Sequence, residues 1–131
     1  MKYAQANLDR SDAIDLEADR ATYEADRARD LYLNGEHGID EVMNDLDLDA
    51  LLFPGSSGAG IAARPGYPTV IVPFGFLANT NGPPMPDGFD ANPRPFGVSF
   101  TGMACSEPRL LELAYAFEQA TMRRVAPPGM P

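Results

Sequence analysis

The stretch "LLFPGSSGAGIAARPGYPTVIVP", from Leu51 to Pro73, decides the fold class. Short apolar runs bounded by Pro and Gly are typical of buried strands, so we predict strands over 49–53 and 67–73. Pro54 is expected to end the first strand, because proline cannot donate to a strand ladder. Since neither run alternates with polar residues, we expect both faces of each strand to be buried.

A long helix is predicted before these strands. Ser11 is the expected N-cap, and the helix should run to about Leu33, where Asn34 and Gly35 stop it. A short helix over 38–45 follows.

The long helix over 11–33 carries one apolar stripe at helical spacing. Its members are Ile14, Ala18, Ala21, Ala25, Ala28 and Tyr32. A stripe that is mostly alanine lets another backbone approach closely but buries little area for each residue. We therefore expect this face to have a partner surface, within the chain or on another molecule.

The second half of the chain supplies a third strand and a last helix. Residues 79–95 are rich in Pro and Gly and are predicted to form a loop. A strand over 96–101 follows, and Ser106 is the expected N-cap of the last helix. The apolar face of this helix is expected to consist of Leu110, Leu113, Ala114, Phe117 and Ala120. Arg123 and Arg124 are expected in its last turn, where a helix dipole favours positive charge.

This order of elements predicts an α/β fold, with a small mixed sheet of about three strands packed by two long helices. The whole chain, residues 1–131, is interpreted as a single domain. Three strands could equally form the edge of a larger sheet, so we expect this domain to be incomplete.

Charge is distributed unevenly along the chain. Residues 1–50 hold 14 Asp and Glu against 5 Lys and Arg, whereas residues 51–131 hold 5 of each. An acidic surface repels nucleic acid and anionic lipid, so we expect neither as a partner. The apolar runs are too short to span a bilayer, and the first ten residues lack the apolar centre of a signal peptide, so we expect a cytoplasmic protein. The single Cys105 indicates no internal disulfide, and we expect no metal and no cofactor.

The loop Gly55-Ser56-Ser57-Gly58 could hold a nucleophile, cradle a phosphate, or turn the chain between two strands. A serine nucleophile needs a base. The single lysine is Lys2, and the single histidine, His37, lies in an expected exposed turn. A phosphate loop of the Walker type would carry a lysine that this stretch lacks.

Four segments in this order resemble one family. "DALLFP", "GYPTVIVPFG", "PFGVSFTG" and "SEPRLLELAYAFEQAT" look like the C-terminal part of amidase signature enzymes, closest to the peptide-amidase-like and general amidase members. The resemblance implies hydrolysis of amides by a Ser–cis-Ser–Lys triad. The long glycine-rich signature that carries those serines is missing here, so no catalytic residue is carried over. The resemblance implies instead that Gly55, Ser56, Ser57 and Gly58 line the substrate pocket.

Three functional hypotheses follow. The first is a C-terminal amidase segment that is inactive alone. The second is a non-catalytic interaction module, or a subunit that complements a separate N-terminal amidase portion or self-associates through helix 11–33. The third is a small anion or nucleotide binder that uses the loop over 55–60.

Overall fold

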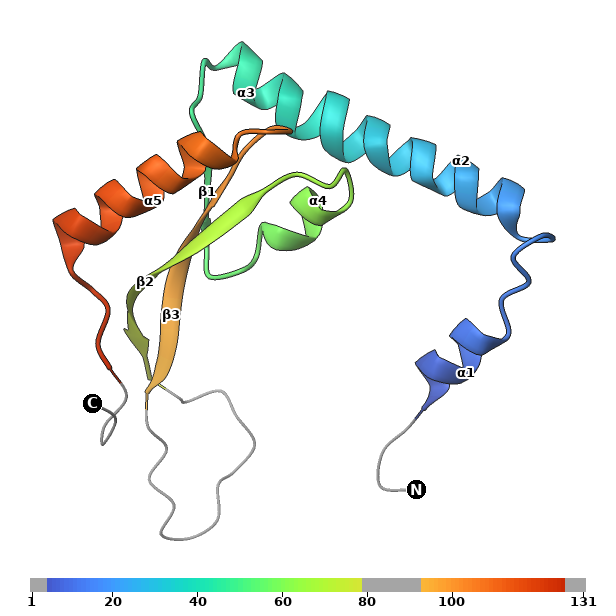
Figure 1. Ribbon diagram of the computed structural model, residues 1–131, viewed down its shortest axis with the longest axis horizontal. Helices are drawn as coiled ribbons and strands as arrows, with labels where there is room; N and C mark the ends of the chain where they lie inside the picture. Colours follow the sequence, from blue (N-terminus) through green and yellow to red (C-terminus); the bar gives the residue numbers. More distant parts are fainter. Residues whose placement is uncertain (1–4, 79–92, 127–131) are drawn as a thin grey trace, which may run out of the picture.

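The computed structural model describes residues 5–78 and 93–126. Its elements, in chain order, are α1 (Ala6–Asp12), α2 (Arg20–Asp30), η1 (Leu31–Asp40), α3 (Glu41–Asp45), β1 (Leu51–Pro54), α4 (Ala59–Ala63), β2 (Thr69–Leu77), β3 (Arg94–Thr101) and α5 (Glu107–Thr121). The predicted α/β class, with three strands and helices packed against them, is confirmed (Figure 1).

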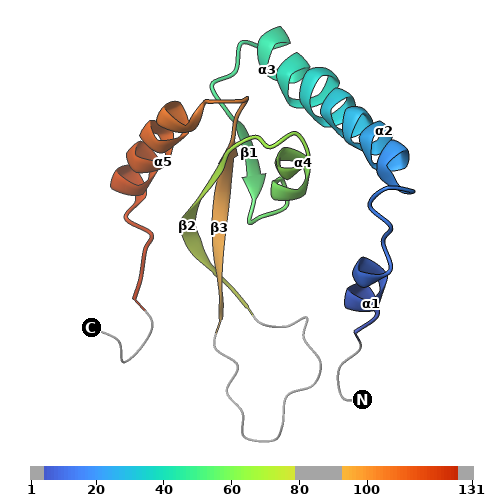
Figure 2. The same ribbon diagram turned by 45° about the vertical axis from the view of Figure 1, so that its right-hand side comes forward.

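The strands form one sheet in the order β1-β3-β2. Both outer strands run antiparallel to β3, so the sheet is antiparallel throughout, where a mixed sheet was predicted. β1 and β2 do run parallel to each other, but β3 lies between them (Figure 2). The pairing puts Leu51, Thr101 and Thr69 side by side on one face, and Leu52, Phe100 and Val70 on the other.

The first face of the sheet is covered at one end by η1, α3 and α4. Ile39, Met43 and Ala62 form its core and are at most 3% exposed. Leu51, Tyr67 and Met103 pack against them. Apolar burial of this kind is the main source of stability in the domain.

The second face is covered by α5. The Phe117 ring lies 5.8 Å from that of Phe100 and 6.3 Å from that of Phe74. Leu110, on the same helix, is fully buried and Ala114 is 5% exposed. The helix therefore uses the face that the spacing of Leu110, Ala114 and Phe117 predicted.

The expectation that both strand faces are buried is wrong for this chain. Leu52 is 62% exposed and Ile71 is 54% exposed. The reason is that the helices cover the sheet incompletely. The segment from α2 to α3 crosses one end of the sheet, and α5 packs mainly on β2 (Figure 1). The strand sequences are apolar along their length, but the described helices cover only part of them.

The predicted helix end at Asn34 and Gly35 comes a few residues too early. The first helix continues to a kink at His37, whose φ and ψ of −97° and 20° are not helical, and the predicted second helix over 38–45 follows the kink. Gly35 serves another purpose, since a Cβ there would lie 3.2 Å from the Tyr67 hydroxyl and 3.4 Å from Pro65 Cβ. This glycine allows close packing and does not end the helix.

The predicted helix start at Ser11 is wrong as well. α1 ends at Asp12, and the Ser11 hydroxyl donates to the Asn7 carbonyl at 2.8 Å. Asp15 accepts the N–H groups of Glu17 and Ala18, both at 3.0 Å, and these bonds hold the pKa of its carboxyl below the ordinary value. This turn separates α1 from α2.

The alanine stripe lies on an exposed surface. α2 has no buried residue, and Ile14 and Tyr32 are each about half exposed. The described part of this chain therefore supplies no partner for the stripe.

Smaller corrections concern the ends of other elements. Residues 94 and 95, placed in the predicted loop, begin β3, and the loop's residues 79–92 lie outside the described residues. α5 ends at Thr121, so Arg123 and Arg124 follow the helix and do not lie in its last turn. Ser106 precedes α5 as predicted, but its hydroxyl donates to the Met103 carbonyl at 2.7 Å and caps no N–H group. Among the described helices, none is long and apolar enough to cross a membrane.

Candidate functional site

The loop after β1 is tied to β3 through Gly55. Its N–H donates to the Gly97 carbonyl at 2.7 Å, and its own carbonyl accepts from the Ser99 hydroxyl. Gly55 has a φ of +58°, a conformation that residues with a Cβ rarely adopt. The first residue of the predicted pocket segment therefore has a fixed backbone position.

The next residues of the loop differ in what they expose. The Ser57 hydroxyl and N–H both donate to the Pro54 carbonyl, at 2.9 and 3.3 Å, and so close the turn. Gly58 is buried, and a Cβ there would lie 2.2 Å from Phe53 Cδ2. Ser56 is exposed. Both predicted serines are exposed, and of the two only the Ser57 hydroxyl is hydrogen-bonded among the described residues.

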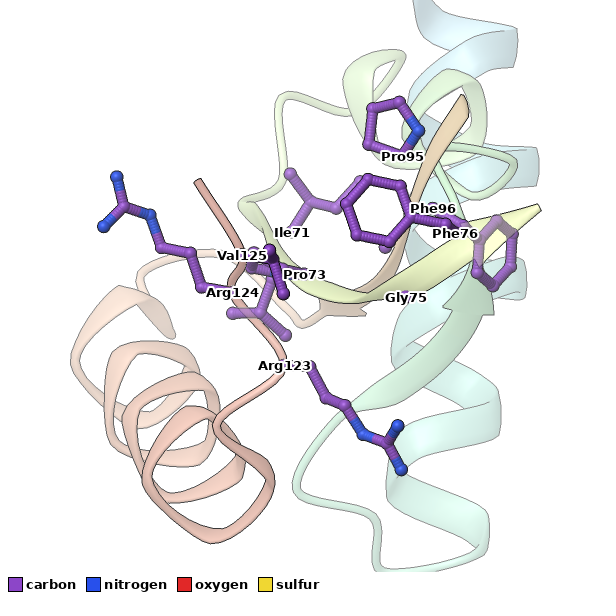
Figure 3. Close-up of a pocket in the computed structure, with 11 residues that line it drawn as sticks. Ile71, Pro73, Gly75, Phe76, Pro95, Phe96, Arg123, Arg124 and Val125 are labelled. Carbon is purple, nitrogen blue, oxygen red and sulfur yellow. The ribbon is translucent and has the colours of Figure 1, made fainter. Parts of the chain in front are cut away.

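Two open cavities meet beside this loop, at the uncovered end of the sheet. One, of about 340 Å³, is lined by Gly55, Ser56, Ile71, Leu77 and residues 94–97. The other, of about 430 Å³, shares Ile71 and residues 95–97, and adds Phe76 and residues 123–125 (Figure 3). Ser57 and Gly58 line neither cavity.

The larger cavity has an apolar floor. Ile71, Pro73, Phe76 and Phe96 supply it, while the Arg123 and Arg124 side chains point away from the aromatic rings (Figure 3). The Arg123 guanidinium instead lies 6.0 Å from the centre of the Phe74 ring, within cation–π range. The arrangement is suited to an apolar group and supplies no converging charge.

The described residues do not give Ser56 or Ser57 a base. His37 lies in η1, where its Nδ1 is 3.1 Å from Glu41 Oε2 and its ring packs on Tyr32. It is exposed as predicted, and it lies at the kink between two helices. Lys2 lies outside the described residues. Within residues 5–78 and 93–126, no three His, Cys, Asp or Glu side chains are grouped as a metal site.

The loop is also a poor match to a phosphate cradle. Its N–H groups at Gly55, Ser57 and Ala59 already donate to the carbonyls of Gly97, Pro54 and Ser56. The helix that follows, α4, has five residues. Fewer backbone donors are therefore available to an anion than the glycine content of the stretch indicates.

A polar pair that sequence reasoning missed lies at the covered end of the sheet. The Tyr67 hydroxyl donates to Asp40 Oδ2 at 2.6 Å across 27 residues of chain. This bond, together with burial and the charges of Asp40 and Glu36, raises the pKa of Tyr67 to about 12. The other oxygen, Asp40 Oδ1, is buried and has no partner among the described residues.

Comparison with curated proteins finds two amidases. The chain is 37% identical over 91 residues to a probable amidase of Arabidopsis thaliana, covering 70% of this chain and 15% of that protein. It is 32% identical over 107 residues to a putative amidase of Arthroderma benhamiae, covering 73% of this chain and 17% of that one. The chain thus spans about a sixth of the length of these relatives. No family model matches it.

Comparison with solved structures finds the same kind of protein. The peptide amidase of Stenotrophomonas maltophilia superposes with a TM-score of 0.74 and 36% identity, over 95% of this chain and 25% of that one. A peptide amidase bound to the competitive inhibitor chymostatin gives the same TM-score and 34% identity, over 98% of this chain and 26% of the other. The predicted relation to amidases is confirmed, and it extends over nearly the whole of this chain.

Proposed function

Because this chain is related in sequence and fold to a segment of amidases, we propose that it serves as the C-terminal part of an amidase signature enzyme. The observation that carries the proposal is the match to a quarter of a peptide amidase over 95% of this chain. The proposed reaction of the complete enzyme is hydrolysis of a carbon–nitrogen bond in an amide.

The proposed task of this chain is structural. It would complete the enzyme's sheet and shape one wall of the substrate pocket, with Gly55, Ser56, Ser57 and Gly58 at that wall. Support comes from the fixed backbone of Gly55 and from the cavity that Gly55 and Ser56 line. The apolar floor beside it would contact an apolar part of the substrate.

We propose that the chain is inactive on its own. A serine nucleophile requires a neighbouring base and donors for the oxyanion, and the described residues place no base beside Ser56 or Ser57. The base and nucleophile would come from an N-terminal amidase portion, either on the same polypeptide or on a separate one.

A complementation assay tests the proposal. The Stenotrophomonas maltophilia peptide amidase, expressed without the quarter that this chain matches, would be co-expressed with this chain, and hydrolysis of a panel of primary amides measured. We expect activity with both parts and none with this chain alone. The enzyme's own excised quarter, supplied separately, is the positive control. Turnover by this chain alone that is lost in Ser56→Ala or Ser57→Ala would overturn the proposal.

A second candidate is self-association through helix 11–33, supported by the exposed alanine stripe on α2. Analytical ultracentrifugation distinguishes it from the first. Under the amidase proposal the isolated chain sediments without a defined dimer, whereas a stable dimer that Ala21→Glu and Ala25→Glu disrupt would favour self-association.

A further inference from the structure

The loop over 55–58 is held from both of its ends. At the first end, the Gly55 N–H and carbonyl are both bonded to β3. At the other end the chain continues through α4 to Tyr67, two residues before β2 begins. Ser56, which lines the smaller cavity, lies between these two attachments. Its position therefore depends on both.

A series of backbone hydrogen bonds connects the loop to Tyr67. The Ala59 N–H donates to the Ser56 carbonyl at 3.1 Å, and the Ala62 N–H donates to the Gly58 carbonyl at 3.2 Å. The Ala62 carbonyl in turn accepts the Tyr67 N–H at 2.8 Å. Ala62 is 1% exposed and belongs to the core. A shift of Tyr67 would therefore reach the loop through these bonds.

The Tyr67 side chain is itself fixed by η1. Its hydroxyl donates to Asp40 Oδ2 at 2.6 Å, a length typical of a bond to an ionised carboxylate. Gly35, one turn earlier in η1, leaves room for the hydroxyl, because a Cβ there would lie 3.2 Å from it. The bond thus attaches the far end of α4 to a helix that is distant in sequence.

This polar pair is not arranged for stability alone. Asp40 Oδ1 is buried and has no partner among the described residues, and a buried polar atom without a partner costs free energy. Two apolar side chains of similar shape would fill the same space without that cost. What the pair of Asp40 and Tyr67 adds is a directional bond, which fixes where the tyrosine lies.

We propose that Tyr67 and Asp40 are positioning residues, which hold the loop over 55–58 in the geometry that receives substrate. This inference rests on the proposed function, which makes the loop a wall of the substrate pocket. Neither residue is among those that line the cavity beside the loop, so both act through α4. Without the bond the wall moves, and contact with bound substrate is lost. Such a loss raises KM more than it lowers kcat, because the wall touches substrate and transition state alike.

The test measures kinetics of the complemented enzyme. Truncated Stenotrophomonas maltophilia peptide amidase is saturated with wild-type, Tyr67→Phe or Asp40→Ala chain, so that a lower stability of the variant does not limit the amount of complex. The substrate is N-acetylphenylalanine amide, whose phenyl group suits the apolar floor of the larger cavity. We expect each variant to raise KM by about fivefold while kcat changes little. The double variant should be no worse than either single one, because both remove the same bond.

Three further variants separate positioning from general effects of substitution. Asp40→Asn keeps an oxygen that can accept from Tyr67, so its KM should stay close to that of the wild-type chain. Glu41→Ala removes the adjacent carboxylate, which is exposed and bonds His37, and should leave KM unchanged. Tyr115→Phe removes an exposed hydroxyl and should also have no effect.

Amide hydrogen exchange on the isolated chain tests the link between Tyr67 and the loop without relying on the proposed function. Tyr67→Phe should speed exchange of the Ala59 and Ala62 amides by about tenfold more than that of the Leu110 amide in α5. Equal changes at all three amides would show that the bond stabilises the chain as a whole, and would overturn the inference.

The outcomes distinguish the two proposals. If the wild-type chain complements and both single variants keep its KM, the inference fails and the proposed function stands. If the wild-type chain does not complement while the enzyme's own quarter does, the proposed function fails, and the inference fails with it because the loop is then no pocket wall.

Discussion

One end of the sheet is covered and the other is bare, although the strands are equally apolar at both. At the covered end, Thr101 is fully buried, and Leu51, which pairs with it, packs against the core of Ile39, Met43 and Ala62. At the bare end, Phe76 is 51% exposed and Leu77 is 38% exposed. The difference shows that apolar strand composition does not by itself determine burial, which depends on which helices cover each end of the sheet.

The largest expected effect is at the covered end. Leu110→Ala should lower the free energy of unfolding by about 3 kcal/mol, because it removes a fully buried side chain and leaves a cavity. Its neighbour Leu111 is 59% exposed, so Leu111→Ala is the matched control and should cost far less. Urea denaturation followed by circular dichroism measures both. Equal losses would mean that α5 is not packed on the sheet as described.

The next largest expected effect tests whether β2 and β3 pack closely at the bare end of the sheet, although side chains there are exposed. A Cβ on Gly97 would lie 2.7 Å from the Val72 carbonyl oxygen, so Gly97→Ala should destabilise the chain by about 2 kcal/mol. Gly75 has no atom within 4 Å of a Cβ position, and Gly75→Ala is the control. Denaturation midpoints compare the two. If Gly97→Ala were neutral, the pairing of β2 with β3 would be loose at this end.

Much of the fold followed from sequence, because it depends on local patterns. The apolar runs located all three strands to within a few residues, and the spacing of Leu110, Ala114 and Phe117 located the buried face of α5. The helix end predicted at Gly35 was placed too early, because a glycine after a helical stripe can either end the helix or allow another segment to pack closely against it. Which use applies depends on Tyr67, a residue 32 positions away.

The candidate site was predictable only in part, for a related reason. The sequence identified the loop over 55–58, but it could not show that Ser57 closes the turn on Pro54 while Ser56 faces the cavity. Nor could it pair Tyr67 with Asp40, since no motif links them. Contacts between distant segments depend on register and helix placement, which composition does not determine.

The Tyr67 pair allows a smaller test at the covered end. Tyr67→Phe removes the bond to Asp40 and should cost about 1 kcal/mol, within the range for one hydrogen bond. The raised pKa of about 12 also predicts a pH dependence, because the unfolded tyrosine loses its proton near its ordinary value of 10.0. Stability from this pair is complete below pH 10 and is lost as the pH rises toward 12.

Absorbance near 295 nm at increasing pH measures this directly, and the ionisation of Tyr67 is expected as a late step near pH 12. In Tyr67→Phe that late step should disappear, and the alkaline decline in stability should become shallower. Tyr115→Phe is the control, since Tyr115 is 65% exposed. A late step that persists in Tyr67→Phe would assign the raised pKa to another residue.

The smallest expected effect is on the surface of the covered end, where Arg109 of α5 reaches Asp49 before β1. Its Nε lies 3.1 Å from Asp49 Oδ1, and this bond and the charge of Arg109 hold the pKa of Asp49 below its ordinary value of 3.8. A lowered acid pKa adds stability that is present above that value and lost as the pH falls below it. Arg109→Gln should therefore raise the Asp49 pKa toward the ordinary value, with the least change in unfolding free energy of the four variants, because exposed ion pairs are screened by water. Carboxyl NMR titration measures the shift.

Glu112→Gln removes the other partner of Arg109, at 3.0 Å, and is the control that should leave the Asp49 pKa lowered. If Asp49 titrated identically in the Arg109→Gln and wild-type chains, α5 would not hold its first turn against the start of β1, and the cover at this end of the sheet would be looser than its buried residues indicate.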